Sequence, residues 1–235
     1  MPIRAVLFDA AGTLIELEQP VGESYAAFAR RAGVTLPAWR LQDAFERILR
    51  GAPARVFPGR SAAEVPGLER EWWRDRVRET FRAADSTVRF RDFDGFFEPL
   101  YGHFGSAAAW TLRLGARAGL SGLRESGHAL GIASNFDHRL PKILEELEVN
   151  QFFSSLTIPA GCGSAKPDAA LFTAALKELG SPPGETLYLG DEPDVELAGA
   201  RDVGICAVPV SALENLADLP ARLDSLATLH ASRRD

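Results

Sequence analysis

The sequence predicts an α/β protein with a doubly wound parallel sheet and a helical domain inserted after the first strand. Helical patterns alternate with short apolar runs that have the length of buried strands, an alternation that favours parallel strands joined by helices. The apolar runs are residues 4–8, 128–133, 155–158, 186–189 and 205–208. The first connection is the exception, because more than 100 residues separate Phe8 from His128, far more than a crossover of one helix needs.

The later connections and the end of the chain each carry a helical pattern. The expected helices are residues 140–147, 168–179, 195–203 and 219–231. The second has Asp168 near its start, a residue type that caps helix N-termini, and Gly180 at its end. These helices are expected to cover the faces of the sheet.

The long insertion is itself predicted to be helical, over residues 22–32, 39–50, 67–84 and 93–104. In the third helix Trp73, Val77 and Phe81 recur at helical spacing, which indicates a face packed inside the insertion rather than a ligand site. Proline and glycine at positions 53, 58, 59 and 66 divide the insertion in two. We therefore expect a core of residues 1–16 and 107–235 and a helical domain of residues 17–106.

The composition is that of an ordinary globular protein and argues against several kinds of partner. A formal charge of −6 and a pI near 5.4 do not suit a surface that binds nucleic acid or anionic lipid. No apolar stretch approaches the roughly 18 residues of a membrane span, and the N-terminal run is too short for a signal peptide. Cys162 and Cys206 show neither a disulfide framework nor metal-ligand spacing. We expect a cytoplasmic protein.

Polar side chains stand where the predicted strands end. They are Asp9 after the first strand, Ser134 and Asn135 after the second, and Asp191 after the fourth, while Lys166 precedes the helix that follows the third. Because ligands of open parallel sheets bind beyond the carboxyl ends of the strands, these groups are expected to converge on one crevice.

The segments FDAAGTL, ASN, KP and GDEPDVE, in this order and spacing, resemble the four motifs of the haloacid dehalogenase superfamily of hydrolases, most of which are phosphatases. The insertion falls between the first and second motifs, as in the branch with an α-helical cap. The resemblance implies a Rossmann-like core, a Mg²⁺ cofactor and a small phosphorylated substrate. It also implies that residues 17–106 are the cap.

The resemblance assigns a role to each motif residue. Asp9 would attack phosphorus and form an aspartyl-phosphate. The metal would be held by Asp9, by the backbone carbonyl of Ala11 and by Asp191. The second acid of the fourth motif is Glu196 if it lies five positions after Asp191, whereas Asp194 is the competing choice. Glu196 would serve the metal through water or hold the lysine.

The phosphoryl group is expected to bind Ser134, Asn135 and Lys166, with the Lys166 ammonium beside the nucleophile. Thr13 and backbone N–H groups of its turn would complete the cradle.

Ala11 departs from the phosphatase pattern, because family phosphatases carry at this position an acid that protonates the leaving group. Haloacid dehalogenases lack this acid too, but Gly190, Asp191 and Glu196 argue against them, since they have no magnesium site of this type. Phosphonate hydrolases of the family carry alanine here and use a cap lysine, whereas the lysines of this chain, Lys142, Lys166 and Lys177, lie outside the insertion. Two alternatives remain: a Mg²⁺-dependent hydrolase, expected to be a slow phosphatase, or a phospho-ligand-binding protein that has lost turnover.

Overall fold

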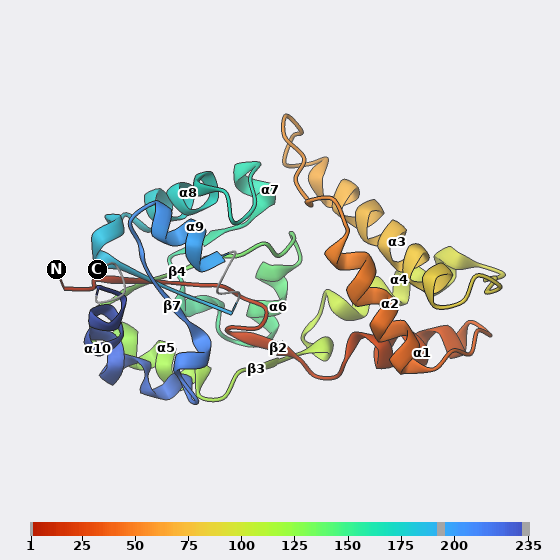
Figure 1. Cartoon of the computed structure of the whole chain (residues 1–235), viewed down its shortest axis with the longest axis horizontal. Helices are drawn as coiled ribbons and strands as arrows, with labels where there is room; N and C mark the ends of the chain where they lie inside the picture. Colours follow the sequence, from red (N-terminus) through yellow and green to blue (C-terminus); the bar gives the residue numbers. More distant parts are fainter. Residues whose placement is uncertain (1, 192–195, 232–235) are drawn as a thin grey trace. The chain divides into compact units, whose positions relative to one another are not determined.

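A computed structural model describes residues 2–191 and 196–231 (Figure 1). The chain divides into two compact units. The core unit comprises Met1–Glu16, Val56–Gly59 and Thr111–Asp235, and the helical unit comprises Leu17–Arg55 and Arg60–Trp110. The domain boundaries expected from the sequence differ from these units at residues 107–110 and at residues 56–59.

The core unit is built on a five-stranded parallel sheet with the order β5-β4-β1-β6-β7. Its strands are β1 (Ala5–Phe8), β4 (Ala129–Ala133), β5 (Ser155–Thr157), β6 (Thr186–Gly190) and β7 (Cys206–Pro209). The chain builds outward from β1 to β4 and β5 and then returns to the other side of β1 to add β6 and β7. The strand order therefore reverses beside β1, the place where such sheets bind ligands.

Helices cover both faces of this sheet, as Figure 1 shows. On one face α8 (Ala169–Leu179) contacts β4 and β5, and α9 (Glu196–Asp202) contacts β6 and β7. On the other face α5 (Ala116–Glu125) contacts β4, and α10 (Leu219–Ala231) contacts β7. The described part of the unit also contains the α-helices α6 (Leu140–Glu146) and α7 (Pro159–Cys162). The predicted fold class is confirmed.

The strands form where they were expected because their side chains are apolar and buried on both faces; every residue of β1, for example, is buried. The helix α5 was not anticipated, since Gly119 and Gly122 weaken its helical pattern. Packing explains the first of these glycines. A Cβ at Gly119 would collide with the backbone carbonyl of Leu216, so glycine allows α5 to approach that segment closely.

The helical unit contains α1 (Val21–Arg31), α2 (Ala38–Arg50), α3 (Val65–Ala84) and α4 (Phe93–Phe104). Its interior is rich in aromatic side chains, and Val77 and Phe81 of α3 are buried there with Trp73 packed against them. The face predicted from their spacing is thus an interior one. No helix within residues 2–191 and 196–231 combines the length and the apolar character that crossing a membrane requires.

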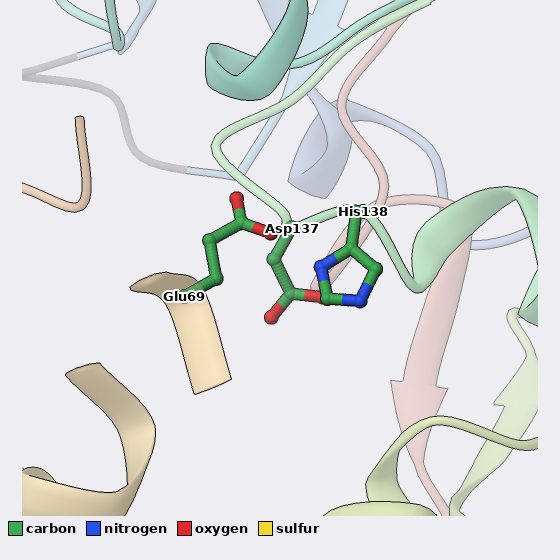
Figure 2. A group of neighbouring side chains, drawn as sticks. All are labelled: Glu69, Asp137 and His138. Carbon is green, nitrogen blue, oxygen red and sulfur yellow. The ribbon is translucent and has the colours of Figure 1, made fainter. Parts of the chain in front are cut away.

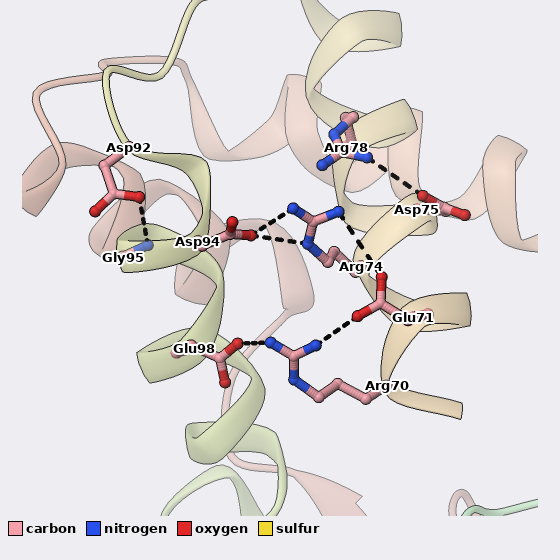
Figure 3. A network of polar contacts seen from close by, with 9 residues as sticks. All are labelled: Arg70, Glu71, Arg74, Asp75, Arg78, Asp92, Asp94, Gly95 and Glu98. Atoms are coloured by element: carbon pink, nitrogen blue, oxygen red, sulfur yellow. Dashed lines mark hydrogen bonds and ion pairs between the residues drawn. The ribbon is translucent and has the colours of Figure 1, made fainter. Parts of the chain in front are cut away.

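Ion pairs join α3 to α4 within this unit (Figure 3). The Arg74 guanidinium donates to Asp94 Oδ1 at 2.8 Å from Nε and 2.5 Å from Nη2. One turn away, Arg70 pairs with Glu98 of α4 and with Glu71 of its own helix. Because these pairs lie at the surface, each is expected to contribute little to stability, and the buried aromatic cluster carries most of the packing.

The two chain segments that lead into and out of the helical unit pair with each other as a two-stranded sheet of β2 (Ile15–Leu17) and β3 (Trp110–Leu112). Arg113 extends this link toward the loop after β1: its guanidinium donates to the carbonyl of Gly12 at 3.1 Å and to Glu16 Oε1 at 2.9 Å. The loop that carries Ala11 and Thr13 is thereby tied to the residue that follows β3.

Candidate active site

Asp9 stands directly after β1, at the edge of the sheet where the strand order reverses. Its N–H donates to the carbonyl of Leu189 at 2.8 Å, and the residue is only 4% exposed. The following turn closes around Ala10, whose carbonyl accepts N–H groups from Thr13, Leu14 and Ile15. Hydrogen bonding to both the neighbouring strand and the turn fixes the carboxylate at the carboxyl end of β1.

Gly12 brings the turn after β1 close to Asp191, which follows β6. Gly12 has a φ of +84°, a left-handed conformation that favours glycine. A Cβ at this position would collide with the Asp191 carboxylate. Glycine is therefore required here both by the backbone and by the approach of the second carboxylate.

Lys166 binds the nucleophile candidate. Its Nζ lies 2.5 Å from Asp9 Oδ1 and 2.5 Å from Glu196 Oε1, and its side chain has no exposed surface. An ammonium buried between two carboxylates offsets part of their negative charge and holds both in place. The structure thus brings together residues that lie 157 positions apart in the chain.

Tyr188 of β6 is a member of this cluster that the sequence analysis missed. Lys166 Nζ donates to its hydroxyl at 2.8 Å, and the hydroxyl donates to Glu196 Oε2 at 3.0 Å. Burial, with the negative charges of Asp9 and Glu196, raises the pKa of Tyr188 well above its usual value, so the phenol keeps its proton. Its position in the sequence could have indicated this role, because Tyr188 and Gly190 lie on the same face of the strand that leads to Asp191.

The carboxylates of Asp9, Asp191 and Glu196 form a group that suits a hard divalent cation. One ligand oxygen from each lies within 4.8 Å of the others, and carboxylate oxygens are the ligands that Mg²⁺ prefers. Burial and the charge of Asp9 raise the pKa of Glu196 to about 7, against the opposing effect of Lys166. Asp194, the competing choice for the second acid, lies outside the described residues.

Asn135 contacts the backbone of Lys166 through both ends of its side-chain amide. Its Oδ1 accepts the Lys166 N–H at 2.7 Å, and its Nδ2 donates to the Lys166 carbonyl at 2.9 Å. The neighbouring Ser134 is 2% exposed, and its Oγ accepts the N–H of Phe136 at 3.2 Å. The binding of substrate by Ser134 and Asn135 stays a prediction. The contact that the structure shows for the Asn135 amide is the one with the Lys166 backbone.

Thr13 offers a hydroxyl whose hydrogen-bonding capacity is not used within the described part of the chain. Its side chain is fully buried, and Oγ1 has no partner there. A buried hydroxyl without a partner is costly, so such a group commonly indicates a ligand or a water molecule. The N–H groups of Gly12 and Thr13 donate within the turn, so any backbone contact to a bound anion would have to come from other residues of this loop.

The loop from β4 to α6 continues past Ser134 to Asp137 and His138, which Figure 2 draws with Glu69 of the helical unit. Asp137 is completely buried and accepts from Arg139, with its two oxygens 2.9 Å from Nε and 2.7 Å from Nη2. This paired interaction stiffens the loop immediately after Ser134. At the start of α8, Asp168 accepts the N–H of Ala170, so its predicted role as a helix cap is confirmed.

Known proteins resemble this chain over most of its length. A family model described as haloacid dehalogenase-like hydrolase matches residues 3–204. The chain is 33% identical over 217 residues to haloacid dehalogenase-like hydrolase domain-containing protein 3 of Mus musculus, covering 92% of this chain and 85% of that one. It is 30% identical over 228 residues to a phosphoserine phosphatase of Thermus thermophilus, covering 88% of each.

A solved structure, L-2-haloacid dehalogenase of Xanthobacter autotrophicus, matches with a TM-score of 0.69 at 17% identity, covering 94% of this chain and 98% of that one. This likeness concerns the fold alone.

Proposed function

The chain belongs to the haloacid dehalogenase-like hydrolase family, as its four motifs predicted, and we propose that it is a Mg²⁺-dependent phosphatase acting on a small phosphorylated metabolite. The observation that carries this proposal is the grouping of the Asp9, Asp191 and Glu196 carboxylates around the end of β1, with Lys166 paired to Asp9. Phosphoryl transfer needs a positioned nucleophile and positive charge beside it, and this grouping supports both.

Asp9 is the proposed nucleophile. Its carboxylate oxygen forms a bond to phosphorus while the bond from phosphorus to the leaving oxygen breaks, and water then hydrolyses the aspartyl-phosphate. Lys166 keeps the Asp9 carboxylate oriented and offers positive charge to the phosphoryl oxygens. Ser134, Asn135 and the unpartnered hydroxyl of Thr13 are the proposed hydrogen-bonding groups for the phosphoryl group.

The oxygen ligands fit a hard cation, so the proposed metal site consists of Asp9, the backbone carbonyl of Ala11, Asp191 and Glu196. Bound Mg²⁺ would offset the negative charge that opposes the approach of a carboxylate to a phosphate dianion. In the structure Glu196 Oε1 lies 2.5 Å from Lys166 Nζ. This contact supports a role of the second acid as a partner of the lysine, in addition to its proposed role at the metal.

The helical unit is proposed to be the cap that selects the substrate. It is inserted between β1 and β4, and its two linkers pair as β2 and β3. Such a paired link suits the opening and closing of a cap over a site. The substrate itself is proposed only as a class, a small phosphate monoester.

A phospho-ligand-binding protein without turnover is the second candidate, and Ala11 is the observation that favours it. A methyl group can neither protonate a leaving group nor deprotonate water. A haloacid dehalogenase is less favoured, because the likeness to that enzyme concerns the fold whereas the three carboxylates suit a metal.

A panel of phosphate esters incubated with Mg²⁺, with release of inorganic phosphate as the readout, tests the proposal. Asp9→Asn is expected to remove phosphate release, and Asp168→Asn is the matched control, because Asp168 is an exposed helix cap at which asparagine also serves. Calorimetry should show that Asp191→Ala weakens Mg²⁺ binding. Metal-dependent phosphate binding with no release from any ester would favour the binding protein, and equal Mg²⁺ affinity in Asp191→Ala would refute the metal site.

A further inference from the structure

The ammonium of Lys166 has a separate acceptor for each of its three N–H groups. Two are carboxylates, Asp9 Oδ1 and Glu196 Oε1, each at 2.5 Å, and the third is the Tyr188 hydroxyl at 2.8 Å. An ammonium carries three donors and no acceptor. Its donors are thus all engaged inside the protein, and the hydroxyl is the neutral member of the set.

The direction of the tyrosine proton follows from this arrangement. Because Lys166 can only donate, the Tyr188 oxygen is the acceptor of that contact and its own hydrogen is available to Glu196 Oε2 at 3.0 Å. Lys166, Tyr188 and Glu196 therefore form a closed ring of contacts in which each oxygen of the Glu196 carboxylate receives one donor. Rotation of the ammonium or of the carboxylate breaks at least one of these contacts.

The tyrosine ring is itself held firmly. Tyr188 is fully buried and lies on β6, which pairs with β1 so that Tyr188 is opposite Leu7. Its ring packs edge-on against Phe172, with centroids 5.2 Å apart and planes at 87°. A Cβ at Gly190 would collide with both the Tyr188 ring and the Glu196 carboxylate, so glycine makes room for this pair. The hydroxyl is thus supplied by a rigid part of the sheet.

We propose that Tyr188 is a positioning residue that, together with Glu196, fixes the Lys166 ammonium against Asp9. A lysine side chain has four rotatable carbon bonds, and attraction to one carboxylate leaves its direction loosely defined. The hydroxyl adds a directional contact from a fixed strand. The proposed consequence for turnover rests on the phosphatase function proposed above, whereas the positioning itself does not.

Tyr188→Phe removes the hydroxyl and keeps the ring. Tyr25→Phe is the matched control, since Tyr25 is a similarly buried tyrosine, 2% exposed, in the helical unit. The chain has only three lysines, Lys142, Lys166 and Lys177, and the other two are exposed. In protein labelled with ¹⁵N-lysine, the Lys166 ammonium is therefore the one whose protons should exchange slowly with water.

In Tyr188→Phe the Lys166 ammonium resonance should shift and its protons should exchange faster, while Tyr25→Phe leaves both unchanged. With p-nitrophenyl phosphate and Mg²⁺, kcat should fall about 10- to 100-fold with KM little altered, because the direction of the lysine rather than the fit of the substrate is disturbed. Should Tyr188→Phe fail to fold, Tyr188→Phe is combined with Glu196→Gln, which removes one of the two buried carboxylates, and its spectra are compared with those of Glu196→Gln alone.

An unchanged Lys166 resonance and exchange rate would overturn the proposal whatever the activity. An altered resonance with wild-type kcat would overturn it too, since the positioning would then have no effect on turnover. If the wild type hydrolyses no phosphate ester while the resonance changes as expected, the positioning role stands and the phosphatase function fails.

Discussion

Replacement of Lys166 by methionine removes the charge at the centre of the site and keeps most of the apolar stem. The Lys166 side chain has no exposed surface and lies 2.5 Å from both Asp9 Oδ1 and Glu196 Oε1. Without the ammonium, two carboxylates remain buried with no cation between them. Breaking a buried ion pair from one side costs about 3–5 kcal/mol, and for a chain of this length each kcal/mol lowers Tm by about 2–4 °C. The expected decrease in Tm is thus about 6–20 °C.

The size of this decrease should depend on pH and on metal. Burial and Asp9 raise the pKa of Glu196 to about 7, and loss of Lys166 removes an influence that lowers it. The Glu196 carboxyl of the variant should be protonated to a greater extent at pH 6 than at pH 8.5, and its protonated form needs no cation. The decrease in Tm should therefore be smaller at pH 6 than at pH 8.5 in EDTA. Mg²⁺ should restore part of the loss at pH 8.5 by binding the carboxylates.

Thermal unfolding followed by circular dichroism measures this effect, with Lys142→Met as the control. Lys142 lies 3.5 Å from Glu146 one helical turn away, and its side chain is 65% exposed, so that pair contributes only about 0.3–0.5 kcal/mol. If Lys166→Met has the Tm of Lys142→Met at both pH values, the ammonium does not stabilise the two buried carboxylates and the charge argument for the site is refuted.

Three further outcomes are expected. Asn135→Ala removes both contacts to the Lys166 backbone and should lower kcat by about tenfold or more, with a loss of about 1–2 kcal/mol in unfolding free energy; unchanged kinetics would contradict its role in holding the lysine. Ala11→Asp supplies the missing acid and should raise turnover of alkyl phosphates by about 10²- to 10⁴-fold, and that of p-nitrophenyl phosphate much less. The rate of phosphate release measures this effect, and an unchanged rate with alkyl phosphates would contradict the prediction. Burial and Arg31 lower the pKa of His103, so the unfolded chain binds the proton more readily than the folded protein. The free energy of unfolding should therefore decrease as the pH falls below about 6.5. Between pH 7.5 and pH 5.5 the Tm of His103→Gln should fall less than that of the wild type. If the two proteins show the same change of Tm with pH, His103 is not a source of the pH dependence.

The order of strands and helices in the core could be predicted from the sequence because each element is determined largely by local pattern. The five strands of the parallel sheet lie within one residue of the expected ranges, since a short apolar run buried on both faces has few other ways to satisfy its backbone and its side chains. No strand was expected at β2 or β3. The same local information placed Asp9 at the end of β1 and Asp191 at the end of β6. It did not reveal α5, because the close packing that requires Gly119 involves the distant carbonyl of Leu216.

The sequence alone predicted the candidate residues of the site, whereas the tertiary structure decided what each of them contacts. Asp9 and Asp191 could be expected at one edge, since parallel strands end on the same side of a sheet. The contact of Asn135 with the Lys166 backbone spans 31 positions, and that of Tyr188 with Lys166 spans 22. Such contacts depend on how loops and strands pack in three dimensions, and the direction of a side chain into a shared, buried site has no signature in local sequence pattern.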